Sequence, residues 1–309
     1  MAIIEVIFPV FAVALIGYTV TFLGLFNARD ISAISRFVFV IAIPVMLFNA
    51  LANIDLPEKV NWAFLLSYYL VAVLIFILGM WVSGRGFAFS PLEQSVFGLG
   101  SSYSNTVLVG LPIVISGLGE EALLPMIMLI SVNSAILFFL VTLMAERNGG
   151  NGRSPLTIAG QTVKSLARNP IIIGIVLGLL FNLLAVPIPG PLATTIDLIS
   201  KAALPSALFV LGASLSAYKI AGHLGEAWMM VGLKLLLMPM LVAIMVFIVF
   251  QLDPLWSAAA VMTAGMPVGI NAYMFSQKYQ ASIATVSTAI LLSTILAIIS
   301  QSVLLAIFS

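Results

Sequence analysis

Long apolar stretches alternate with short polar ones along this chain, and the pattern predicts helices that cross a lipid bilayer. A membrane-spanning helix needs roughly 20 mostly apolar residues. Dividing the sequence at charges, glycine clusters and prolines gives ten such stretches. Their expected limits are 3–25, 34–54, 61–83, 92–117, 122–145, 170–187, 193–216, 227–250, 254–276 and 282–308. The predicted fold class is an all-α polytopic membrane protein with ten transmembrane helices.

The longest polar segment runs from Glu146 to Asn169 and is expected to be a linker between the fifth and sixth spans. It contains Asn148-Gly149-Gly150-Asn151-Gly152, a run typical of loops. The linker divides the chain almost evenly. We therefore expect a five-helix repeat in residues 1–147, a cytoplasmic linker in 148–168 and a second five-helix repeat in 169–309.

Basic residues predict the orientation, since they accumulate in cytoplasmic loops. Counted on alternate sides of ten spans, one side has only Lys59. The other side has Arg29, Arg36, Arg85, Arg147, Arg153, Lys164, Arg168, Lys219 and Lys278. Both termini are then expected outside the cytoplasm. The first stretch, from Ala2 to Leu25, lacks a basic lead-in and is too long for a cleaved signal peptide.

Composition narrows the classes of function. Hydrophobic residues make up 62% of the chain and charged residues 7%, as a protein embedded in lipid requires. The net charge of +1 argues against a nucleic-acid partner. There is no cysteine, and the single histidine, His223, is expected in a solvated loop, so we expect no metal site. An enzyme is disfavoured, because the spans hold no acidic pair at depth and no thiol nucleophile.

Short matches suggest that the second half repeats the first. The matching positions, all 161 residues apart, are Pro9 with Pro170, Gly17 with Gly178, and Pro44-x-x-Leu47-Phe48 with Pro205-x-x-Leu208-Phe209. Five spans in each half would make the second copy enter the membrane from the opposite side. The prediction is an inverted-topology repeat.

Two glycine–proline sequences, Gly110-Leu111-Pro112 and Gly265-Met266-Pro267, each interrupt a predicted span. Proline cannot donate a backbone hydrogen bond and glycine eases unwinding, so we expect the backbone to open at both places. New half-helices would start at Ile113 and Val268. Their partly positive amino ends, meeting near the midplane, would hold an anion. The alternative is that these prolines only kink helices for packing.

Polar but uncharged side chains surround the expected breaks. They are Ser104, Asn105 and Thr106 near the first, and Gly269, Asn271, Tyr273 and Gln277 near the second. Such groups can bind a carboxylate or a cation in a low dielectric, although serine and threonine also serve helix packing.

Ionisable residues inside spans are costly and are candidates for function. Asp197 and Lys201 stand four apart, so a neutralising pair near the outer end of a span is expected. Glu5 is expected at the outer surface. Lys234 is expected to extend its stem toward the headgroups, with a support or coupling role left open.

Several motifs resemble one transporter family. The run from Ser104 to Pro112 resembles the Asn-Thr-x-x-x-Gly-x-Pro motif of the auxin efflux carrier (AEC) family of the BART superfamily. That family includes plant PIN carriers and bacterial malate and malonate permeases. Pro267-Val268-Gly269-Ile270, continuing through Phe275 to Tyr279 and Ser287-Thr288-Ala289, is similar to the family's ninth-helix motif. Arg36-Phe37-Val38 leading to Pro44 resembles its second helix.

The resemblance implies crossed, broken fourth and ninth helices, as in NhaA and the bile acid symporters. It also implies scaffold and transport domains drawn from both repeats, and elevator-type alternating access for an organic anion. Asn105 matches the family's asparagine before the crossover, and Asn133 falls where plant members carry a substrate-facing glutamine. Two features of plant members are missing. No ionisable residue lies between Asn61 and Gly84, where they carry an Asp and Lys pair, and the linker is too short for their regulatory loop.

The predicted function is secondary transport of a small organic anion, a carboxylate. The predicted substrate-binding residues are Asn105, Thr106, Gly110, Pro112, Ile113, Asn133, Pro267, Val268, Gly269 and Asn271. Support or coupling is assigned to Ser104, Lys234, Tyr273 and Gln277. A sodium-coupled symporter similar to the bile acid carriers, and a membrane sensor that does not transport, are the alternatives.

The expected surroundings follow from this prediction. No cofactor is expected, and H⁺ and Na⁺ are both open as coupling ions. Besides the substrate, membrane lipid is the expected partner, and a homodimer stays open. The expected location is the bacterial inner (plasma) membrane.

Overall fold

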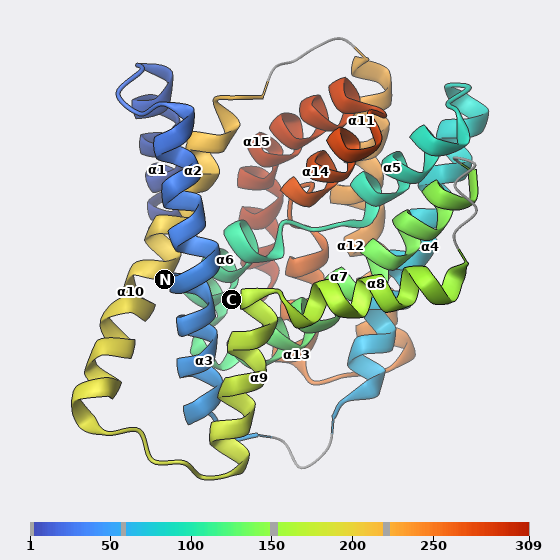
Figure 1. Ribbon diagram of the computed structural model, residues 1–309. Coiled ribbons are helices and arrows are strands. Elements are labelled where there is room, and N and C mark those ends of the chain that lie inside the picture. Colours follow the sequence, from blue (N-terminus) through green and yellow to red (C-terminus); the bar gives the residue numbers. More distant parts are fainter. Residues whose placement is uncertain (1–2, 57–59, 149–153, 219–222, 309) are drawn as a thin grey trace.

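The computed structural model describes residues 3–56, 60–148, 154–218 and 223–308, and its regular structure is helical apart from one isolated β-bridge (Figure 1). Seven of the described helical runs are long and apolar enough to cross a membrane. They are α1 (Ile3–Phe22), α2–η1–α3 (Ala28–Phe37, Val38–Ala42, Ile43–Asn53), α4 (Trp62–Gly86), α7 (Leu123–Asn148), α10 (Gly190–Leu215), α11–η4–α12–η5 (Leu224–Gly232, Leu233–Leu237, Met238–Ala243, Ile244–Val249) and α15 (Ile283–Phe308). The molecule is an all-helical polytopic membrane protein.

These seven runs correspond to seven of the ten predicted spans. The second run begins at Ala28, six residues before its predicted start, because Asn27 and Asp30 form a reciprocal capping box there. The prediction of ten spans depends on the other three stretches, 92–117, 170–187 and 254–276.

Two of those three stretches are broken helices. The first is α5 (Pro91–Ser102) followed by η2 (Thr106–Gly110) and α6 (Leu111–Leu118). The second is α13 (Pro254–Ala264) followed by α14 (Ile270–Tyr279). A short 3₁₀ turn, η3 (Glu120–Ala122), joins α6 to α7.

The third stretch is α9 (Pro170–Leu183), whose 14 residues extend about 21 Å and fall short of a bilayer core of about 30 Å. It follows α8 (Pro155–Ala167) at a bend of 68°, and the two together could form an eighth span. The ten-span count therefore stays a prediction.

Helix α8 occupies most of the segment that the sequence predicts to be a linker between the fifth and sixth spans, a helix that the sequence analysis did not predict. Ser154 starts α8 by accepting a hydrogen bond from the backbone of Thr157, and Pro155 takes the first helical position, where its missing N–H costs nothing. In Figure 1, α8 crosses the front of the molecule and α9 descends from its end. Lys59, Arg153 and Lys219, which the orientation count used, lie outside the described residues.

Helices α1, α2–η1–α3, α9 and α10 pack into one group, in which α1 lies on α10 and α3 on α9 (Figure 1, left). Glycines bring these helices into backbone contact. A Cβ at Gly17 would collide with the carbonyl oxygen of Phe209, and one at Gly178 would approach that of Phe48. Small residues permit such close packing in membranes, where no hydrophobic force joins helices. The two contacts are equivalent under the 161-residue displacement found in the sequence.

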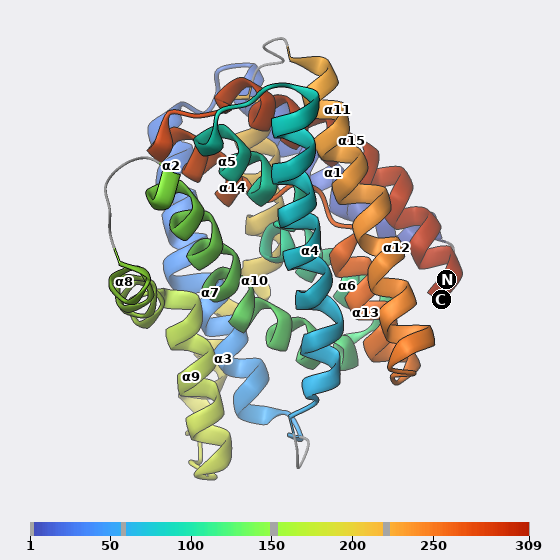
Figure 2. The ribbon, with the colours of Figure 1, turned by 90° about the vertical axis from the view of Figure 1, so that its right-hand side faces the viewer.

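The other long helices surround a second apolar core. Its fully buried side chains include Phe64, Tyr68 and Phe76 of α4 and Phe97 of α5. Figure 2 shows α4 beside α12, with which it is in contact. The two broken helices run between this core and the four-helix group.

Three prolines are accommodated within helices by π-helical turns. Pro44, Pro112 and Pro239 each occupy the second position of an α-helical segment that follows a five-residue π segment, respectively η1, η2 and η4. A proline ring clashes with the carbonyl one α-turn back, and the wider π turn relieves that clash. The chain therefore stays helical through these prolines.

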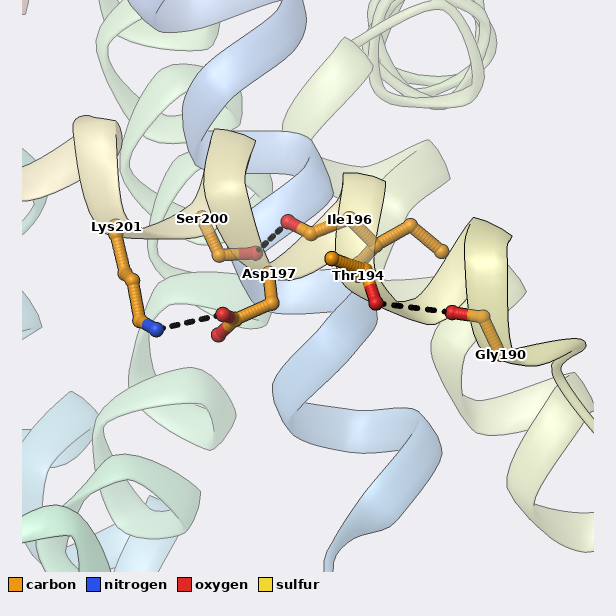
Figure 3. A network of polar contacts seen from close by, with 6 residues as sticks. All are labelled: Gly190, Thr194, Ile196, Asp197, Ser200 and Lys201. Atoms are coloured by element: carbon orange, nitrogen blue, oxygen red, sulfur yellow. Dashed lines mark hydrogen bonds and ion pairs between the residues drawn. The ribbon is translucent and has the colours of Figure 1, made fainter.

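Asp197 and Lys201 form the predicted ion pair on α10 (Figure 3). Lys201 Nζ lies 2.6 Å from Asp197 Oδ2, and the two side chains are 72% and 47% exposed. Ser200 and Thr194 nearby donate to backbone carbonyls of their own helix. The pair is a local helix contact, separate from the broken helices.

Candidate functional site at the two helix breaks

The breaks in the two interrupted helices lie against each other as a short antiparallel pairing. Ser104 and Val268 form an isolated β-bridge. The Asn105 backbone N–H donates to the Pro267 carbonyl oxygen at 2.9 Å. Unpaired backbone groups cost several kcal/mol in hydrocarbon, so this pairing lets two helices open inside an apolar protein.

Gly269 is required by the close approach of the two open segments at the breaks. Its N–H donates to the Tyr103 carbonyl oxygen at 2.8 Å, the second main-chain bond across the breaks. A Cβ at this position would collide with the Tyr103 ring. The backbone angle is ordinary, with φ at −73°, so space rather than conformation demands glycine here.

The first break does not lie at Gly110-Leu111-Pro112, as the sequence predicted. The chain opens at residues 103–105 and is helical again from Thr106, so the predicted start at Ile113 is wrong. The π segment before Pro112 absorbs the proline and removes the need to unwind there.

The second break lies at its predicted place but is longer than expected. Residues 265–269 are outside α-helix, and α14 begins at Ile270 rather than at Val268. Val268 stays extended because it pairs with Ser104 and its N–H donates to Ser293 Oγ of α15 at 3.0 Å.

Other side chains that the sequence did not single out hold the breaks in place. The Tyr68 hydroxyl of α4 lies 3.1 Å from Ser104 Oγ. The Tyr103 hydroxyl accepts from Asn271 Nδ2 at 2.8 Å and lies 3.1 Å from Ser134 Oγ of α7. Tyr103 follows two serines in an otherwise apolar span, which is a local polar signal. Tyr68 and Ser134 carry no such signal, because only the fold brings them near.

A pocket of about 410 Å³ opens beside the pairing, and we call it the crossover pocket. Its polar lining includes six predicted residues, Ser104, Asn105, Thr106, Asn133, Gly269 and Asn271, together with Tyr103, Ser134 and Asn169. Apolar side chains from the four-helix group and α7 complete it, among them Phe39, Ile171 and Phe138. No described residue that lines the pocket has a formal charge. A volume near 400 Å³ is at the small end of ligand sites.

Five predicted binding residues do not line the pocket. Gly110, Pro112 and Ile113 are buried inside the half-helix that starts at Thr106. Pro267 and Val268 lie in the pairing, behind the lining, where they contribute backbone groups.

Two amide side chains in the pocket each have a buried atom without a partner. Within the described part of the chain, Asn105 Nδ2 and Asn133 Oδ1 form no hydrogen bond. Both side chains are at least 94% buried. Leaving such a group unsatisfied costs about 1–3 kcal/mol, so these atoms are suited to a polar ligand.

No side chain caps the amino end of either half-helix, although the Thr106 N–H donates to the Ser104 carbonyl oxygen at 2.8 Å. Neither Asn105, before η2, nor Gly269, before α14, accepts a hydrogen bond from its helix through a side chain. The first-turn N–H groups of a helix have no partner within it and attract negative charge. Both ends adjoin the crossover pocket, since Thr106, Val107, Ile270 and Asn271 line it. The arrangement therefore offers an anion partial positive charge from two directions.

Lys234 is buried behind the breaks and does not reach toward the headgroups, so the expectation of an extended stem is wrong. It lies in the π segment η4 with no exposed surface and donates to the carbonyl oxygen of Ala264, the last residue of α13. The last carbonyl groups of a helix have no partner within it, so the hydrogen bond from Lys234 to one of them explains its inward position. Lys234 does not line the crossover pocket.

Tyr273 and Gln277 also lie outside the pocket. Gln277 Nε2 donates to the Tyr273 hydroxyl at 2.8 Å, and the Tyr273 ring packs edge-on against Tyr218 at 4.9 Å. These two side chains therefore form a hydrogen bond with each other along the exposed face of α14.

Comparison with known proteins agrees with a transport role. A family model described as "Membrane transport protein" matches residues 2–305. A "Putative malonate transporter" of Rhizobium meliloti is 26% identical over 303 residues, covering 97% of this chain and 93% of that protein. "Auxin efflux carrier component 5" of Arabidopsis thaliana is 25% identical over 328 residues, covering 94% and 92%. An "Uncharacterized transporter" of Methanothermobacter thermautotrophicus is 26% identical over 306 residues, covering 96% and 95%.

These matches extend over nearly the whole chain and confirm the resemblance seen in its motifs. The family consists of membrane transporters and not of enzymes. The chain belongs to the membrane transport protein family, the family of the auxin efflux carriers.

Proposed function

We propose that this protein is a secondary carrier of a small carboxylate, which binds in the crossover pocket between the two half-helix ends that no side chain caps. The observation that carries the proposal is the meeting of these ends at a pocket without formal charge. Helix ends and amide groups bind an anion without the large desolvation cost of a buried, fixed ion pair.

The ligand contacts follow from the unsatisfied groups. Asn105 Nδ2 is a free donor and suits a carboxylate oxygen. Asn133 Oδ1 is a free acceptor and suits a hydroxyl or a protonated carboxyl group. The Rhizobium relative is named "Putative malonate transporter", which supports a dicarboxylate as the substrate. Only the singly protonated form of a dicarboxylate would present both a carboxylate to Asn105 Nδ2 and a carboxyl proton to Asn133 Oδ1.

The mechanism we propose is movement of the broken helices and their neighbours against the four-helix group. Backbone contacts at Gly17 and Gly178 make that group suited to act as a fixed scaffold. These two contacts, equivalent at a displacement of 161 residues, also support an inverted repeat of five helices in each half. Alternating access of this elevator type would expose the crossover pocket to each side in turn.

Substitution of Asn105 tests the binding site. Asn105→Ala removes the unpaired donor, and we expect the binding free energy of the carboxylate to weaken by about 1.5–3 kcal/mol, the range for hydrogen bonds to charged groups. The thermal stabilisation of the purified protein by added carboxylate, which reports this binding, should shrink accordingly. Uptake of radiolabelled carboxylate into proteoliposomes should fall about tenfold or more. The matched control is Asn53→Ala, an exposed amide at the end of α3. Unchanged carboxylate binding in Asn105→Ala would show that the crossover pocket is not the binding site.

A sodium-coupled symporter is the second candidate, and replacing Na⁺ by K⁺ separates the two. Lys234 Nζ already donates to the Ala264 carbonyl oxygen at the carboxyl end of α13, a place where a coupling cation would be favoured. We therefore expect uptake to be the same in either salt. Strict dependence on Na⁺ would favour the symporter, and binding without any uptake would favour a sensor.

A further inference from the structure

Two cations stand at the carboxyl end of helix α8, Lys164 in its last turn and Arg168 as its C-cap. Lys164 and Arg168 stand four residues apart, one helical turn, and both are exposed. With Gln161 and Ser165 they line a hollow of about 600 Å³, which we call the basic hollow. Neither cation forms an ion pair with any residue that the structure describes.

The basic hollow adjoins the crossover pocket at the bend between α8 and α9. Asn169 and Pro170 line both of them. Asn169 also fixes the start of α9, since its Oδ1 accepts from the Ile171 backbone at 3.0 Å. The bend of 68° turns α8 across the front of the molecule, out of line with α9 (Figure 1).

The two sites differ in charge. The crossover pocket is lined by uncharged residues, and Lys234, which is buried behind the breaks, does not line it and donates to the Ala264 carbonyl oxygen. An anion in the pocket therefore meets only the partial charges of helix ends. Full positive charges stand at the neighbouring hollow, where exposed cations raise the local concentration of an anion without holding it tightly.

We propose that the basic hollow is an antechamber, in which Lys164 and Arg168 collect the carboxylate and pass it over Asn169 to the crossover pocket. This role rests on the proposed transport of an anion. Electrostatics gives the two sites different roles. Exposed cations attract a carboxylate at long range and release it easily, whereas the uncharged pocket provides selective contacts.

The test is the salt dependence of malonate uptake by the double variant Lys164→Gln/Arg168→Gln in proteoliposomes of zwitterionic lipid. At about 0.01 M salt, where charges act over about 30 Å, we expect the uptake rate of the double variant at subsaturating malonate to be roughly fivefold lower than that of the wild type. At about 1 M salt, where they act over about 3 Å, the difference should nearly vanish. The maximal rate should be unchanged, and Lys164→Arg/Arg168→Lys should behave like the wild type.

The matched control is Arg29→Gln/Arg85→Gln. It removes two exposed cations from the same predicted side of the membrane, and neither residue lines the basic hollow or the crossover pocket. An equal loss in this control, or none in the double variant, would overturn the antechamber. A loss seen only in vesicles with anionic lipid would also overturn it, because the hollow would then bind lipid phosphate. If the wild type took up no carboxylate, the proposed function would fail first and the antechamber with it.

Discussion

The two glycine–proline sequences look alike and have opposite structures. At Gly265-Met266-Pro267 the helix ends and the backbone opens. At Gly110-Leu111-Pro112 the helix continues through the proline, and the opening lies several residues earlier, at 103–105.

The difference shows that a proline alone does not decide where a membrane helix opens. A break forms where unpaired amides find other partners, and here each break supplies partners to the other through Ser104 and Val268. Pro112 lies within helical backbone, and the wider turn of η2 before it accommodates its ring. The position of a break is therefore a property of the pair.

The largest effect is expected from filling the contact between the breaks. Gly269→Ala forces a methyl group against the Tyr103 ring, and we expect a loss of about 1–3 kcal/mol in stability together with most of the transport activity. Stability is measured as the heat-induced loss of monodisperse protein in detergent. Transport activity is measured as uptake in proteoliposomes. The control is Gly160→Ala in α8, where a Cβ meets nothing within 4 Å. Similar behaviour of the two variants would mean that the breaks are not tightly paired.

The comparison itself is tested by replacing each proline. Pro267→Ala restores an N–H inside the open segment and lets α13 extend toward the pocket, so we expect transport to fall about tenfold, the equivalent of about 1.4 kcal/mol. Pro112→Ala lies where the chain is already helical, and we expect less than about a twofold change in transport. Equal effects in paired uptake assays would contradict different roles for the two prolines.

A smaller effect is expected from one side-chain support of the first break. Tyr68→Phe removes the hydroxyl beside Ser104 Oγ and should lower stability by about 0.5–1.5 kcal/mol, the typical net value of one hydrogen bond. Substrate affinity should change little, because Tyr68 does not line the pocket. Thermal denaturation with and without substrate provides the measurement. Tyr18→Phe, at an exposed tyrosine of α1, is the control.

Much of the fold is predictable from the sequence because length and apolarity are local properties. Seven predicted spans are long helices, and the Asp197–Lys201 pair forms because its residues are one turn apart. Helix α8 was missed because glycines and charges near its start are typical of a loop. The position of the first break was missed because it depends on Val268, far along the chain.

The same distinction applies to the site. Asn105, Thr106 and Asn271 could be found because they stand beside motifs in the sequence. Ser293 and Tyr68 reach the breaks only through tertiary packing, and nothing near them in the sequence marks them. Lys234 was misplaced since its partner, the carboxyl end of α13, exists only once that helix ends at Ala264.

The two main-chain hydrogen bonds across the breaks have a consequence for how selectivity can diverge. The bonds from Asn105 N–H to the Pro267 carbonyl and from Gly269 N–H to the Tyr103 carbonyl use atoms that almost every residue possesses. Exchanging Asn105 or Asn271 for another side chain leaves these bonds in place. The backbone pairing that holds the site together thus does not depend on the side chains that select the substrate. Relatives can therefore acquire new substrates by single substitutions within the same fold.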